Sequence, residues 1–144
     1  MPANASLSVV QRMYEYFDKG DMDTIRREIF AKDLVWRLPG HNPLAGVKHG
    51  ADEVIAFFAQ LRKVNVQVDL IGLDSWGENT VVETHRGHGK SGDYSLDAYN
   101  CTHYKIRDGR IYDVQVYMSD EHAADTFFNG VVQLKPIPDR LADA

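Results

Sequence analysis

Apolar residues recur every three or four positions in the first part of the chain, as they do on the buried face of an amphipathic helix. Leu7, Val10 and Phe17 form the first such stripe, and Gly20 supplies a stop signal after it. The pattern therefore predicts a first helix that begins at about residue 6 or 8 and ends at residue 19.

Two further helices are predicted before the period changes. Asp21 is placed to cap the second helix, in which Met22, Ile25 and Ile29 share one face. The third helix is expected to follow Gly50, with Asp52 and Glu53 near its positive N-terminal end. Its buried face is formed by four apolar residues: Val54, Phe57, Phe58 and Leu61.

From residue 64 onward, apolar and polar residues alternate with a period of two, which is typical of strands. Strands are predicted over about 64–70, 80–90, 94–107 and 110–118, after an early strand at Leu34–Leu38. Short turns such as Asp108-Gly109 join the late strands, so the sheet should be largely antiparallel. The segment His41–Gly50 has no period and is predicted to be a loop. Helices first and strands last favour an α+β fold with helices on one face of the sheet.

Composition narrows the function classes. The 144 residues fit one domain. The 16 Lys and Arg against 21 Asp and Glu give a net charge of −5, which disfavours nucleic acid as a partner. No apolar run approaches the roughly 20 residues of a membrane span, and no signal peptide is recognisable at the N-terminus. A single cysteine, Cys101, excludes an internal disulfide, so a cytoplasmic protein is expected.

Six short stretches, spread in order over about residues 7–128, resemble the nuclear transport factor 2-like superfamily, which includes ketosteroid isomerases and SnoaL-like polyketide cyclases. No one stretch is specific alone, but together they carry the resemblance. They are Val9–Arg12, Gly20–Asp23, Ile29–Trp36, Pro39–Gly46, Gly50–Val54 and Arg107–Ile111.

The resemblance implies a cone-shaped, cystatin-like α+β barrel, in which a strongly curved, mostly antiparallel sheet wraps around helices. It implies a domain over residues 1–128 with an apolar cavity for a hydrophobic small molecule, and no cofactor. It also implies a homodimer formed through the outer face of the sheet. Residues 129–144, which contain Pro136 and Pro138, are expected to be an extended C-terminal tail.

The resemblance also shows which known chemistries this chain lacks. Met13, Leu38 and Thr102 occupy the positions of the tyrosine, base and acid of a ketosteroid isomerase. His85, Gly87 and Val116 occupy the positions of the arginine and two aspartates of the epoxide hydrolase branch. Neither mechanism is therefore expected. The scytalone dehydratase-like branch, which uses histidines with a carboxylate and tyrosines, is not contradicted.

Alternation predicts which late-strand residues face the cavity. On the strand over 94–107, Asn100, Thr102 and Tyr104 are the polar members of a mostly apolar face, as in many small-ligand sites. On the last strand the apolar set is expected to be Tyr112, Val114, Val116 and Met118.

Glu83 and His85 share one face of the strand over 80–90, and the resemblance places His85 on the cavity side. A neutral imidazole is suited to act as a general base near pH 7. The other interpretation is a histidine on the surface, at a dimer face, or satisfied by a neighbour. His85 and His88 point to opposite faces, so they are not expected to hold a metal together.

Three residues outside the late strands complete the predicted substrate-binding set. Tyr14 is expected to point its hydroxyl into the cavity, and Trp36 to line it. His41 is expected at the mouth, with solvent exposure as the alternative. For Tyr14 and Trp36 the alternative is plain core packing.

Two functions remain open. The first is a cofactor-independent isomerase, dehydratase or cyclase, in which His85 and Glu83 transfer a proton. The second is a non-catalytic ligand-binding module or dimeric scaffold with the same fold.

Overall fold

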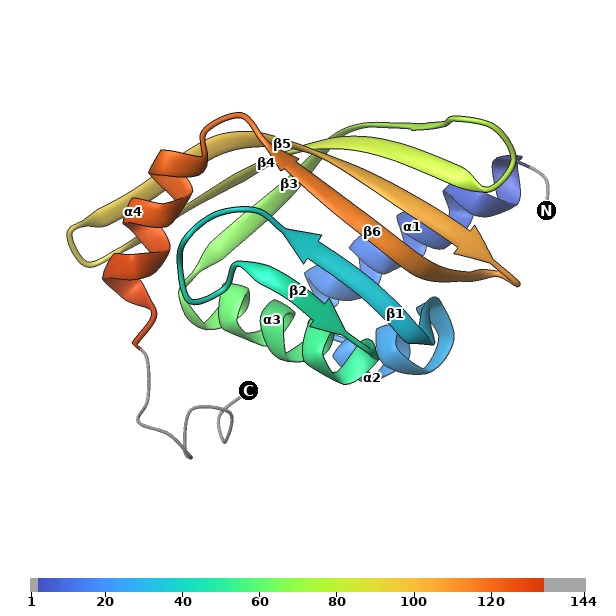
Figure 1. The fold of residues 1–144 in the computed structure, drawn as a ribbon, viewed down its shortest axis with the longest axis horizontal. Coiled ribbons are helices and arrows are strands. Elements are labelled where there is room, and N and C mark those ends of the chain that lie inside the picture. The colour runs from blue at the N-terminus through green and yellow to red at the C-terminus, as the bar shows by residue number, and fades with distance from the viewer. Residues whose placement is uncertain (1–2, 134–144) are drawn as a thin grey trace.

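A computed structural model describes residues 3–133, which form four helices, one π-helical turn and six strands (Figure 1). In chain order they are α1 (Ala3–Lys19), α2 (Met22–Thr24), the π-helical turn η1 (Ile25–Ile29), β1 (Phe30–Leu38), β2 (Gly46–His49), α3 (Ala51–Lys63), β3 (Val66–Ser75), β4 (Thr80–Ser91), β5 (Tyr94–Arg107), β6 (Arg110–Met118) and α4 (Glu121–Val131). The α+β class is confirmed.

The six strands form one curved sheet in the order β2-β1-β6-β5-β4-β3. All neighbouring strands are antiparallel except β1 and β6, which are parallel, so the expectation of a mostly antiparallel sheet is confirmed. The sheet is unclosed over the described residues, because β2 and β3 are its two edges.

Helices α1 and α3 lie on one side of the sheet, as Figure 1 shows. The buried residues of α1 and α3 pack with inward residues of the strands in a single apolar core. Aromatic rings are prominent in this core, since Trp36 lies 5.3 Å from Phe58 and 5.9 Å from Tyr104 between ring centroids. No helix within residues 3–133 has the length and apolar character needed to cross a membrane.

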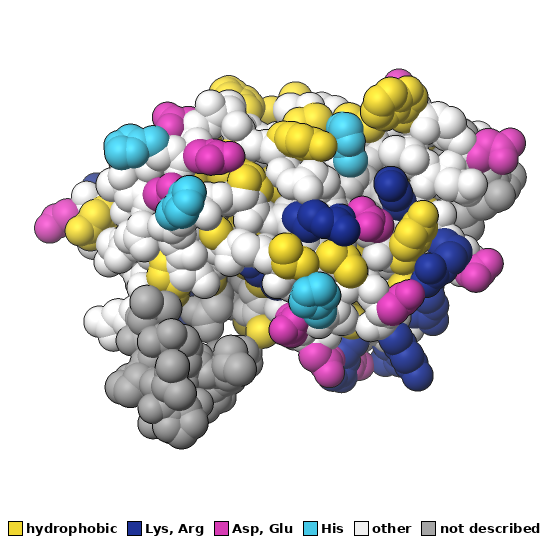
Figure 2. Space-filling view, in the orientation of Figure 1, with side chains coloured by type: hydrophobic (Ala, Val, Ile, Leu, Met, Phe, Trp, Pro, Cys, Tyr) yellow, Lys and Arg dark blue, Asp and Glu magenta, His cyan; other side chains and the backbone are white. Residues whose placement is uncertain are grey.

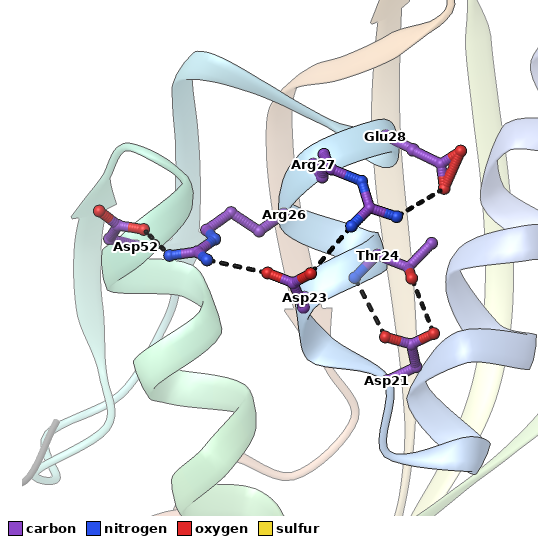
Figure 3. Close-up of polar contacts among 7 residues, drawn as sticks. All are labelled: Asp21, Asp23, Thr24, Arg26, Arg27, Glu28 and Asp52. Carbon is purple, nitrogen blue, oxygen red and sulfur yellow. Dashed lines mark hydrogen bonds and ion pairs between the residues drawn. The ribbon is translucent and has the colours of Figure 1, made fainter.

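The corner between α1 and η1 is held by local polar contacts. Gly20 takes φ +75°, a left-handed conformation that glycine adopts without strain. Asp21 then caps α2, because its carboxylate accepts hydrogen bonds from the backbone N–H and the hydroxyl of Thr24 (Figure 3). Asp23 pairs with Arg26 and Arg27 at 2.9 Å, but these side chains are exposed, so the pairs add little stability.

Helix α4 is not among the three helices predicted from the sequence. The Asp120 carboxylate accepts a hydrogen bond from the backbone N–H of Ala123. The helix packs against the β4–β5 hairpin, where a Cβ on Gly130 would lie 2.4 Å from ring atoms of Tyr94. It runs three residues into the segment expected to be an extended tail. The rest of that segment, 134–144, lies outside the described residues.

Two other expectations about the strands are wrong. The predicted loop His41–Gly50 contains β2, which pairs with β1 along the sheet edge. At the start of β6 the buried residue is Ile111. Tyr112 is only half-buried, and its ring centroid lies 4.5 Å from the Arg107 guanidinium. A register shift at Lys105/Ile106 interrupts the alternation between β5 and β6 and causes this difference.

Candidate functional site

A cavity of about 100 Å³ lies between the sheet and its covering helices. Its walls are almost entirely apolar, with aromatic side chains from α1, α3, β1 and α4. Protein cavities lined by apolar groups bind apolar ligands, and one of roughly 150 Å³ takes up benzene. The cavity therefore suits a small hydrophobic molecule.

Most of the predicted site residues line this cavity. They are Tyr14, Trp36, His85, Asn100, Thr102, Tyr104, Val116 and Met118. Tyr14 comes from α1 and Trp36 from β1, while the others come from the inward faces of β4, β5 and β6. The alternation along β5 thus predicted correctly which side chains point inward.

Glu83 lies behind His85, away from the cavity wall. Its side chain is fully buried, and the His85 side chain is 13% exposed. His85 Nδ1 is 3.0 Å from both Glu83 carboxylate oxygens. A buried carboxylate needs hydrogen-bond donors, so Nδ1 carries a proton and donates it to Glu83.

The other ring nitrogen is directed to the cavity side of the dyad. His85 Nε2 lies 3.1 Å from Nδ2 of Asn100, its partner in the β4–β5 register. With the proton on Nδ1, Nε2 carries a lone pair that accepts a hydrogen bond from this amide. The pair of strands thus presents one basic nitrogen and one amide to a bound molecule.

Two tyrosine hydroxyls extend the network. Tyr104 donates to Glu83 Oε1 at 3.4 Å, and Tyr14 Oη lies 3.4 Å from His85 Nδ1 and 3.5 Å from Tyr104 Oη. Burial raises the pKa of Tyr14 well above its usual value, and the negative charge of Glu83 adds to the effect. Burial, then the nearby Tyr14 and Glu83, raise the pKa of Tyr104 in the same direction. Both hydroxyls therefore stay protonated and available as donors at neutral pH.

Two further polar side chains are buried in the cavity wall. Thr102 pairs with Glu83 across β4 and β5 and is 1% exposed. Trp36 Nε1 is buried and has no hydrogen-bond partner among residues 3–133.

His41 is not part of the cavity, and its placement there was wrong. It is exposed, and its backbone N–H donates to Asp125 Oδ1 at 2.7 Å. Asn42 Nδ2 donates to the same oxygen, and Asn129 Nδ2 donates to His41 O. The hydrogen bond from Asn42 is the largest cause of a lowered Asp125 pKa. The loop is thus attached to α4 by its backbone, which leaves the His41 side chain outside.

Sequence reasoning missed Gly87 as a wall residue and Asp125 as the anchor of the loop. A glycine inside an alternating strand indicates that another group approaches the backbone closely. Gly87 is such a glycine, so the sequence alone could have marked it as a wall residue. Among the described residues, no group of three or more His, Cys, Asp or Glu side chains is arranged to hold a metal ion.

Comparisons with known proteins agree with this architecture. The profile of the SnoaL-like domain matches residues 10–114. An uncharacterized protein of Mycobacterium tuberculosis is 26% identical over 131 residues, which cover 89% of this chain and 99% of that protein.

Two solved structures are also similar. Bal32a, from a soil-derived mobile gene cassette, has a TM-score of 0.83 and 26% identity, and the match covers 88% of this chain and 98% of that one. TerC, solved as co-crystals with polyporic acid, has a TM-score of 0.73 and 18% identity, with 86% and 98% of the two chains covered. At that identity the likeness to TerC is one of fold.

Proposed function

The chain belongs to the SnoaL-like domain family, and from this membership we propose that it is a cofactor-independent enzyme that moves a proton on a hydrophobic small molecule. The observation that carries the proposal is the Glu83–His85 pair, with Nδ1 of His85 3.0 Å from a fully buried carboxylate and Nε2 on the cavity side. The reaction class is isomerisation, dehydration or aldol-type cyclisation. TerC, which has a similar fold, was co-crystallised with polyporic acid, and this supports a small-molecule ligand.

In the proposed mechanism, His85 Nε2 removes a proton from the substrate, and Glu83 stabilises the imidazolium that forms. The amide of Asn100 exchanges its bond to Nε2 for one to the substrate oxygen on which negative charge develops. The Tyr14 hydroxyl lies 3.4 Å from Nδ1, on the Glu83 side of the ring, so its part in the mechanism is to help orient His85. The proton then returns from His85 to another atom of the substrate or to its leaving group, so no redox partner is needed.

The test is deuterium exchange into small ketones, such as 3-cyclohexenone, in D₂O. We expect the wild-type protein to accelerate exchange at the carbon next to the carbonyl, and His85→Gln to lose about 10²- to 10⁴-fold of that rate. His88→Gln is the matched control, because His88 lies on the outer face of the same strand and bonds Asp69. Exchange by His85→Gln at the wild-type rate would remove His85 from the mechanism.

One observation favours the alternative, a non-catalytic ligand-binding domain. His85 Nε2 is already occupied by Asn100, so the network is satisfied without a substrate. This function predicts ketone binding with no exchange above the buffer rate, in the wild type and in His85→Gln alike.

We also propose a homodimer through the outer sheet face. Trp76, Tyr99 and Tyr117 are more than half exposed there, and His103 lies between Trp76 and Tyr117 with ring centroids 5.8 and 5.0 Å away. Figure 2 shows hydrophobic side chains gathered along the upper edge of the molecule, over the sheet. Tyr99→Glu should reduce the dimer in sedimentation velocity, whereas a wild-type monomer at high concentration would refute it.

A further inference from the structure

Gly87 is part of the cavity wall, on the same strand as the Glu83–His85 pair. It faces inward on β4, two residues after His85. Gly87 pairs with Val68 of β3 and with Ala98 of β5 in the register. These three paired residues form one row across the sheet, and all have small side chains. The next row carries His85 and Asn100. The space above Gly87 is therefore next to both polar groups.

The backbone does not require a glycine at this position. The φ of Gly87 is outside the left-handed region, and a Cβ placed there would meet only Asn100 Nδ2, at an ordinary contact distance of 3.7 Å. Gly89 differs, because a Cβ there would lie 2.4 Å from the carbonyl oxygen of Asn65. A glycine weakens a strand interior, so its presence at 87 is best explained by the space it leaves.

The charges around this space restrict what can enter it. No Lys or Arg is present among the described residues that line the cavity. The nearest carboxylate is the buried Glu83, directly behind His85. A carboxylate or phosphate on the ligand would meet a negative charge with no cation to offset it, whereas a neutral carbonyl or hydroxyl can bond the Asn100 amide or His85.

We infer that Gly87 determines substrate specificity: the uncharged carbonyl or hydroxyl end of the substrate lies over its bare backbone, between His85 Nε2 and the Asn100 amide. The inference rests on the proposed function, because it names the part of the substrate that meets the proton-transferring nitrogen. It assigns the orientation of the substrate to Gly87, while the exclusion of anions rests on Glu83 and on a described lining without Lys or Arg.

The test measures binding and does not need turnover. The ligands are cyclohexanone, its hydrocarbon counterpart methylenecyclohexane, and cyclohexanecarboxylate. Binding is followed through the ¹³C-labelled methyl of Met118, a wall residue that pairs with Asn100 in the register. The methyl of Met22, which does not line the cavity, is the internal reference.

We expect the wild-type protein to bind the ketone at least about tenfold more tightly than either other ligand. Gly87→Ala should weaken ketone binding about tenfold, since one methyl group fills the space, while its melting temperature stays at or above that of the wild type. The matched control is Gly72→Ala on β3, where a Cβ would meet nothing within 4 Å.

Unchanged ketone affinity in Gly87→Ala, or a wild-type protein that does not prefer the ketone, would overturn the inference. Its failure is distinguishable from failure of the proposed function. If Gly87→Ala loses ketone binding but His85→Gln exchanges deuterium normally, the binding position stands and the catalytic role of His85 falls. If Gly87→Ala keeps the wild-type ketone affinity but His85→Gln loses deuterium exchange, the catalytic role of His85 stands and the binding position over Gly87 falls.

Discussion

His85 Nδ1 lies 3.0 Å from both carboxylate oxygens of Glu83, two residues away on the same strand. Residues at this spacing are roughly 7 Å apart along the backbone, so the two side chains must lean toward each other. The contact removes one ring nitrogen from reaction and leaves the other on the side of the cavity. A single strand thus supplies both the orienting group and the reactive group.

This relationship predicts the effect of Glu83→Gln on the histidine ring. The neutral amide can donate to Nδ1 as well as accept from it, so the preference for the Nδ1-protonated tautomer should be lost. Long-range ¹H–¹⁵N spectra should show mainly that tautomer in the wild type and a mixture in the variant. Ketone exchange should fall about 10²- to 10⁴-fold. Glu15→Gln, on the exposed face of α1, should change neither quantity.

The buried tyrosines predict a loss of stability at alkaline pH. Tyr14 and Tyr104 have raised pKa values in the folded state, so above about pH 10 the unfolded chain loses protons that the folded chain retains. The free energy of unfolding should be unaffected by these groups below pH 9. Above pH 10 it should fall, by up to about 1.4 kcal/mol per pH unit for each tyrosine.

Urea denaturation between pH 8 and 11 checks this prediction. Tyr104→Phe should have a shallower fall than the wild type, while Tyr94→Phe, which removes the hydroxyl of an exposed tyrosine, should keep the wild-type slope. Equal slopes in all three proteins would show that the buried tyrosines ionise normally.

Lys48 predicts that the free energy of unfolding rises with pH, over a lower pH range than the fall caused by the two tyrosines. Burial lowers the pKa of Lys48 to about 8, although Glu53 partly offsets the effect. The ammonium donates to the carbonyl of Leu44 and lies 5.1 Å from the ring centroid of Phe57. Between pH 8 and 10 the unfolded chain holds a proton that the folded chain releases, so stability should rise by up to about 1.4 kcal/mol per pH unit.

Lys48→Met should abolish this rise, and Lys105→Met, at an exposed position on β5, should not. The same urea series, read between pH 7 and 10, gives the comparison. A rise that persists in Lys48→Met would assign it to another group.

Asp125 predicts how the loop after β1 is held. Its carboxylate accepts from the His41 backbone N–H and from Asn42, and these bonds lower its pKa. Asp125→Ala should therefore accelerate amide hydrogen exchange at His41. In the wild type, the protection of the His41 amide relative to its intrinsic exchange rate should fall as the pH drops through the lowered pKa of Asp125. The control is Glu121→Ala, in the exposed first turn of α4, which should leave exchange at His41 unchanged. If the His41 amide exchanges as slowly in Asp125→Ala as in the wild type, other contacts hold the loop.

The inward faces of β4 and β5 were predictable because alternation fixes side-chain direction once a strand is recognised. Asn100 was placed in this way, whereas on β4 alternation put Glu83 and His85 on one face and the family resemblance placed His85 on the cavity side. His41 was misplaced because no period fixes direction in a loop, and the atom that determines its position belongs to Asp125, more than 80 residues away. Tyr112 was misplaced because a bulge restarts the alternation, and a bulge leaves no clear mark in the residues around it.

Short or locally ambiguous elements explain the other differences. β2 has four residues, including Gly46, and forms only because β1 provides a partner. α4 ends in Asn129-Gly130-Val131, which reads as a break, but the glycine is needed for contact with Tyr94. Propensity cannot reveal either element, since tertiary contacts decide both.

The parallel pairing of β1 with β6 joins residues about 80 positions apart in the chain. During synthesis on a ribosome, β1 and β2 emerge long before their neighbour exists, and one edge of β1 must wait unpaired. The sheet can be completed only after residues 111–115 leave the exit tunnel, so a chain cut short before β6 would expose that edge to other chains.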